Sequence, residues 1–66
     1  MTSKEKRRRI KDCRAFACQW LWFARCLLEH MVTRPDEEHS MWMMSVLDDF
    51  IRAKEYHDEA RNLAKL

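Results

Sequence analysis

The sequence predicts an all-α fold, an antiparallel helical hairpin that dimerises into a four-helix bundle. Its 66 residues include no glycine and one proline, so the tight turns of a β-sheet have almost no residues to form them. Apolar residues recur at alternating steps of three and four along two stretches of similar length. Between the stretches, Thr33-Arg34-Pro35 interrupts the helical pattern. We therefore expect one domain over residues 1–66, with helices at about 3–32 and 36–65 and a turn at 33–35.

The first predicted helix begins with a capping signal and has a regular apolar line. Thr2 is placed to cap the helix, and Glu5 is placed to reach back to the Thr2 backbone. We call the line of expected contact between helices the seam. Phe16, Leu21, Phe23 and Leu28 flank it on both sides, so the apolar stripe is wider than one neighbouring helix can cover. The predicted seam residues are Ile10, Cys13, Ala17, Trp20, Ala24, Leu27 and Met31.

The second predicted helix repeats this pattern. Asp36, Glu37 and Glu38 suit the positive N-terminal end of a helix. The short connection predicts that this helix folds back antiparallel on the first. His57 falls on its seam, where we expect a core histidine bonded to a polar neighbour. The predicted seam residues are Met43, Val46, Phe50, Ala53, His57, Ala60 and Ala64.

Two wide apolar stripes in so short a chain predict self-association. A domain of this length buries only about 60% of its unfolded surface, and its core contributes little stability without disulfides, metals or a partner. One hairpin would leave much of each stripe in water, more than monomers tolerate. A homodimer with C2 symmetry is the simplest way to cover it.

Charge is distributed unevenly along the chain. Residues 1–34 have nine Lys/Arg against three Asp/Glu, whereas residues 35–66 have four against eight. The basic residues of the first helix share one side of it and could follow phosphate groups of a nucleic acid. Alternatively, they pair with acidic groups of the partner subunit, either the Asp36–Glu38 segment or the Asp48-Asp49 pair. The candidate nucleic-acid-binding residues are Lys4, Arg7, Arg8, Lys11 and Arg14.

Trp22 is the candidate anchor for a partner protein. It lies opposite the seam, with Arg25 nearby, and tryptophan is enriched among the residues that dominate binding energy at interfaces. Coverage by a further subunit or by a bend of the helix is the alternative.

The sequence offers no sign of catalysis or of a bound cofactor. It contains no nucleophile–base arrangement, and a glycine-rich phosphate loop cannot exist without glycine. Cys26 and His30 have the spacing of half a zinc site, which His39 or a second subunit would have to complete. Unsupported pairs of this kind are common, so we expect no metal. The three cysteines match no Cys-x-x-Cys motif and suit reduced thiols in the cytoplasm.

The apolar run at 15–28 is too short and too polar to span a bilayer. Binding to a membrane surface is a third interpretation, disfavoured because the second helix has a seam to cover that run.

Two resemblances add to this reading. The hairpin of two equal seam-bearing helices, with its Met-Thr-x-x-Glu-Lys start, resembles the Rop family of plasmid copy-number proteins, which are C2 four-helix dimers that bind paired RNA loops. The MTSKEKRRRIKDCRAF opening and the CQWLWFARCLLEH run are similar to the small orphan early-region proteins of lambdoid bacteriophages. The second resemblance implies a regulator in the host cytoplasm that binds host factors or biases the lysis–lysogeny choice. We therefore expect a dimeric protein-interaction module, with nucleic-acid binding as the alternative.

Overall fold

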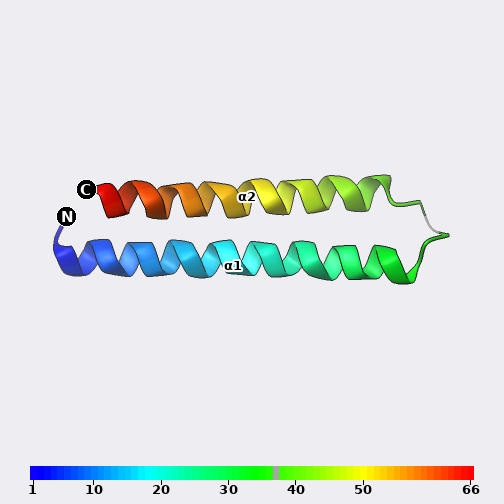
Figure 1. Ribbon diagram of the computed structural model, residues 1–66, viewed down its shortest axis with the longest axis horizontal. Helices are drawn as coiled ribbons and strands as arrows, with labels where there is room; N and C mark the ends of the chain where they lie inside the picture. The colour runs from blue at the N-terminus through cyan, green and yellow to red at the C-terminus, as the bar shows by residue number, and fades with distance from the viewer. Residues whose placement is uncertain (37) are drawn as a thin grey trace.

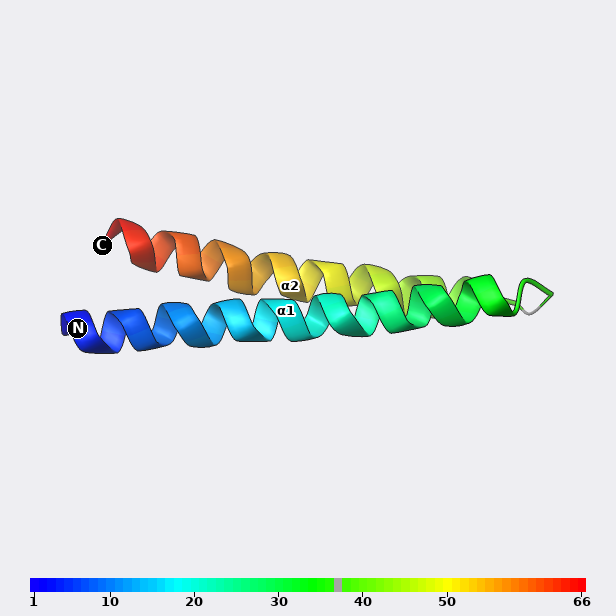
Figure 2. The same cartoon turned by 60° about the horizontal axis from the view of Figure 1, so that its bottom comes forward.

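The computed structural model describes residues 1–36 and 38–66, which form two α-helices folded back on each other (Figure 1). Helix α1 spans Ser3–Thr33 and helix α2 spans Ser40–Lys65. The two run antiparallel at a shallow crossing angle, so both chain termini lie at one end and the connection at the other (Figure 2). The molecule is a rod of 52 × 14 × 12 Å. The all-α hairpin predicted from the sequence is confirmed.

Helix α1 begins with the predicted capping box. The Glu5 N–H donates to Thr2 Oγ1 at 3.1 Å, and the Thr2 N–H donates to Glu5 Oε2 at 3.4 Å. These bonds satisfy two backbone donors that the first turn would otherwise leave unpaired. At the other end, the Arg34 N–H donates to the Met31 carbonyl at 3.3 Å, and Pro35 follows directly.

Helix α2 begins at Ser40, four residues later than the position predicted from the acidic residues. Asp36 and Glu38 belong to the connection, and Glu37 lies outside the described residues. The Ser40 N–H donates to Glu38 Oε1 at 2.9 Å, which holds the pKa of that carboxyl below its ordinary value. His39 Nε2 donates to the Arg34 carbonyl at 2.7 Å. These two hydrogen bonds hold residues of the connection outside the helix, so α2 begins at Ser40 and not at Asp36.

The seam of α1 lies against α2. Its small residues Ala17 and Ala24 are almost fully buried, at 2% and 0% exposure. Short side chains at these positions let the two backbones approach closely. Cys13 and Met31 are also buried, and the bulkier members of the line, Ile10, Trp20 and Leu27, are half-buried at its edges.

The predicted seam of α2 needs a correction within the single chain. Val46, Ala53 and Ala60 are buried as expected. The other four members of the predicted line are exposed, namely Met43, Phe50, His57 and Ala64. Relative to the predicted orientation, α2 is rotated about its own axis, so that Asp49 faces α1 in place of Phe50 and Tyr56 in place of His57. The Tyr56 ring stacks on Phe16 with 5.3 Å between ring centroids. The observed line is Val46, Asp49, Ala53, Tyr56, Ala60 and Leu63.

The rotation of α2 leaves a thin core. Asp49 is buried at 7% exposure, in a place where the apolar pattern predicted Phe50. Among the described residues, no large side chain is fully buried, whereas Phe50 keeps 43% of its surface exposed. A single hairpin therefore leaves much of its apolar surface in water.

Candidate functional site

The two sides of the seam differ in how they are closed. On one side, four contacts join the helices from the termini to the connection. Arg9 forms an ion pair with Glu59 at 2.8 Å, and the Phe16 and Tyr56 rings stack. The remaining two contacts are the Arg52 guanidinium over the Trp20 ring at 5.1 Å and the His30 ring on the Trp42 ring at 4.6 Å. We call this the closed side.

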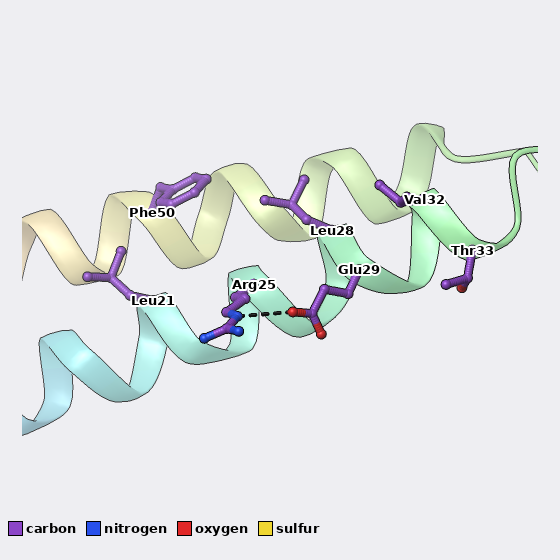
Figure 3. Close-up of a pocket in the computed structure, with 7 residues that line it drawn as sticks. All are labelled: Leu21, Arg25, Leu28, Glu29, Val32, Thr33 and Phe50. Atoms are coloured by element: carbon purple, nitrogen blue, oxygen red, sulfur yellow. Dashed lines mark hydrogen bonds and ion pairs between the residues drawn. The ribbon is translucent and has the colours of Figure 1, made fainter.

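The other side of the seam is an apolar groove (Figure 3). Leu21, Leu28 and Val32 of α1 and Phe50 of α2 line it, and its volume is about 530 Å³. The charges at its rim, Arg25 and Glu29, form an ion pair with each other at 3.0 Å. We call this the open side.

The groove continues along the open side toward the chain termini and becomes polar there. A second hollow of about 370 Å³ shares Leu21 and Phe50 with the first and adds Lys54, His57 and Arg61. Asp58 also lines it and binds Lys54 at 2.7 Å, and this hydrogen bond holds the pKa of Asp58 below its ordinary value.

Heptad positions define the open side along its whole length. With the observed seam at positions a and d, positions e and b lie on the groove side of both helices. None of the residues at these positions is acidic. On α1 they are Lys4, Arg7, Lys11, Arg14, Cys18, Leu21, Arg25, Leu28 and Val32, and on α2 they are Ser40, Met43, Leu47, Phe50, Lys54, His57, Arg61 and Ala64.

The open side thus has two halves of different chemistry. The half near the connection is apolar, and its exposed members are Leu21, Leu28, Val32, Met43, Leu47 and Phe50. We call it the apolar half. The half near the termini, which we call the basic half, has lysines and arginines from both helices. Its members are Lys4, Arg7, Lys11, Arg14 and Arg61.

The candidate nucleic-acid-binding residues of the sequence all lie exposed on α1. Four of them, all but Arg8, belong to the basic half, and Arg8 follows on the outward surface of the helix. None of the five forms an ion pair with the described residues, although Arg9, between them in sequence, pairs with Glu59 on the closed side. The pairing of the cluster with acidic groups of a partner subunit stays a prediction.

Trp22 and Arg25, the candidate partner-binding residues, lie next to each other on the outer surface of α1. Trp22 is 59% exposed, and its ring contacts that of Phe23 with 5.6 Å between centroids. Arg25 lies on the groove rim and is held by Glu29 (Figure 3). Trp22 is therefore an exposed aromatic ring, and Arg25 beside it forms part of the rim of the apolar groove.

The cysteines and histidines are dispersed. Cys18 and Cys26 are exposed, while Cys13 is buried in the seam. Burial raises the pKa of the Cys13 thiol, and the nearby Glu59 carboxylate raises it further. The His30 ring is stacked on Trp42, and no group of three His, Cys, Asp or Glu within residues 1–36 and 38–66 has the arrangement of a metal site.

Sequence reasoning missed the groove and the share that α2 contributes to the basic half. The sequence prediction placed Phe50 in the contact between the two helices and did not include Arg61 in a binding surface. The apolar pattern gave no signal that Asp49 occupies the seam. With Asp49 there, Phe50 and Arg61 fall on the same side as Leu21 and Arg14.

In the described part of the chain, neither helix has a stretch long and apolar enough to cross a membrane. Comparison of the chain with protein-family models, with curated proteins and with solved structures found no match.

Proposed function

We propose that this chain is a homodimeric binding module in which two hairpins pack their apolar halves against each other. The observation that supports this most is the groove of Leu21, Leu28, Val32 and Phe50, which a single hairpin leaves open to water. Among the described residues, the charged groups that line it are Arg25 and Glu29, which form an ion pair with each other.

The size of the apolar half suits a small interface between two copies. Its six side chains keep between 37% and 79% of their surface exposed. At roughly 150–200 Å² for a fully exposed side chain of this size, they offer on the order of 500 Å² of apolar surface. Polar neighbours around the rim bring this near the ~800 Å² per partner of a standard interface. We expect a dissociation constant on the order of micromolar.

Charge repulsion favours one orientation of the two hairpins. A parallel arrangement would place the two basic halves beside each other, which would cost free energy. An antiparallel arrangement about a C2 axis overlaps the apolar halves and directs the basic halves to opposite ends. Within the overlap the two hairpins form a four-helix bundle, and we expect the packing angles of such bundles there.

A second copy is the favoured occupant, because the apolar half is complementary to itself. Two apolar surfaces of the same length can cover each other without leaving a charge unpaired. The exposed Trp22, next to this interface, would remain free to engage a further protein. The likeness to phage early proteins suggests a host factor as that protein.

Sedimentation equilibrium of the wild-type chain tests the dimer. The chain has a mass of 8.1 kDa, so the proposal predicts a concentration-dependent mass that rises to 2 × 8.1 = 16.2 kDa. A constant mass of 8.1 kDa up to roughly ten times the expected dissociation constant would contradict it. If Trp22 binds a further protein, the Trp22→Ala variant should keep the dimer mass but should no longer displace the wild-type chain from that protein.

A further inference from the structure

The basic half holds cations that form no ion pair with an acidic group of the described residues, although Asp58, which is bound to Lys54, lines the same hollow as Arg61. They are Lys4, Arg7, Lys11 and Arg14 from α1, and Arg61 from α2. The four ion pairs among the described residues engage none of these five. Their charge is therefore available to a ligand.

The five cations form a continuous surface across both helices. The ion pair between Arg9 and Glu59 fixes the register of the helices and places Arg61 level with the segment between Arg7 and Lys11. Along α1, the distance from Lys4 to Arg14 is about 15 Å at 1.5 Å per residue. A ligand in contact with all five must present negative charges over a length of this order.

The rest of the molecule orients such a ligand toward the open side. Asp12 and Glu55 lie on the opposite side of the hairpin, at position c of the heptads, and form no ion pair with the described residues. Asp48 and Glu59 lie on that side too, paired with Arg52 and Arg9. A polyanion is repelled there and attracted to the basic half, which gives it one preferred approach.

The aromatic and apolar side chains near the cations distinguish between classes of polyanion. Single-stranded nucleic acids bind on exposed aromatic rings, but the rings of this part of the hairpin, Phe16 and Tyr56, stack on each other on the closed side. Helices that bind a membrane surface set basic residues beside apolar residues along their length. Here the cations and the apolar side chains occupy separate halves.

We propose that the basic half binds the phosphate backbone of double-stranded nucleic acid, without reading its sequence. Lysine and arginine side chains from two helices can contact phosphates, and phosphate contacts position a protein without specifying bases. The inference does not depend on dimerisation, because each chain has the complete basic half.

Fluorescence anisotropy with a labelled DNA duplex and an RNA duplex of about 20 base pairs tests this between about 50 and 200 mM salt. Five phosphate contacts predict a slope of log affinity against log salt of about −4 to −5 per chain. Arg61→Gln should weaken binding and reduce that slope by about one. Arg52→Gln is the matched control, because it removes the same charge from the closed side. Circular dichroism establishes whether both variants fold. If Arg61→Gln does not fold, the double variant Arg7→Gln/Arg14→Gln replaces it, and we expect this variant to reduce the slope by about two.

Several results would overturn the inference. The first is no duplex binding at about 50 mM salt, and the second is an equal loss of duplex affinity in Arg61→Gln and Arg52→Gln. The other two are tighter binding to a single strand of the same length, and binding to anionic phosphatidylserine vesicles but not to duplexes. Sedimentation equilibrium on the same samples separates the two proposals. A monomer that binds duplexes with the expected slope contradicts the dimer and leaves the nucleic-acid surface in place.

Discussion

Replacing Phe50 by alanine should dissociate the dimer while leaving the hairpin helical. Phe50 keeps 43% of its surface exposed in the single chain and lines the groove of the apolar half. For a ring of roughly 200 Å², this leaves about 90 Å² to be covered by the second copy. At about 25 cal/mol per Å², the loss is about 2 kcal/mol for each copy and about 4 kcal/mol for the dimer. The dissociation constant should therefore rise about a thousandfold.

Sedimentation equilibrium over a range of concentrations measures this change, and Ile51→Ala is the matched control. Ile51 is 56% exposed, more than Phe50, but it lies on the outer surface of α2 and lines neither hollow of the open side. We expect its dissociation constant to stay within about threefold of wild type. If Phe50→Ala dimerises like wild type, or if Ile51→Ala dissociates to the same extent, the groove is not the interface.

Further expectations concern the cap, the seam and the thiols. Thr2→Ala removes the capping box and should lower the free energy of unfolding by about 1 kcal/mol in urea denaturation; an unchanged midpoint would contradict the cap's role. Asp49→Leu replaces a buried carboxylate with an apolar side chain, so the Tm followed by circular dichroism should rise by roughly 5–10 °C, and a fall would show that the carboxylate supports the seam. Cys13 is buried and its pKa is raised, so mass spectrometry after iodoacetamide treatment at neutral pH should find it modified more slowly than Cys18 and Cys26. Equal rates at the three thiols would indicate that the seam opens readily.

The sequence predicted the hairpin because its strongest signals are local. The capping box of Thr2 and Glu5 involves residues three apart, and Pro35 ends a helix by its own geometry. The seam of α1 was also predictable, since small residues at Ala17 and Ala24 alternate with bulky ones at a constant spacing. Each of these features depends on one stretch of chain only.

The rotation of α2 could not be predicted from its apolar pattern. Asp49 and Phe50 both follow Val46 at a helical step, and hydrophobicity alone favours Phe50 for the buried position. The packing instead brings Tyr56 against Phe16 and Arg52 over Trp20, contacts between residues more than thirty positions apart. Contacts between distant residues decided which of the two neighbouring lines faces α1.

The start of α2 was misplaced for a similar reason. Three acidic residues in a row suit the first turn of a helix, but the same carboxylates can accept bonds from outside it. In the structure Glu38 accepts the Ser40 N–H, and His39 donates to the Arg34 carbonyl across the connection. The open side depends on the rotation of α2 and not on where that helix begins, because the groove exists only when Phe50 is turned away from the seam.

Isotope-filtered NOE spectroscopy on an equimolar mixture of ¹³C-labelled and unlabelled chains tests the central claim most directly. If the apolar halves pack against each other, the Phe50 ring of one copy should give intermolecular NOEs to the Leu21 and Leu28 methyl groups of the other. Intermolecular NOEs confined to Trp22 and Ile51 would place the interface on the outer surface of the helices and contradict the account.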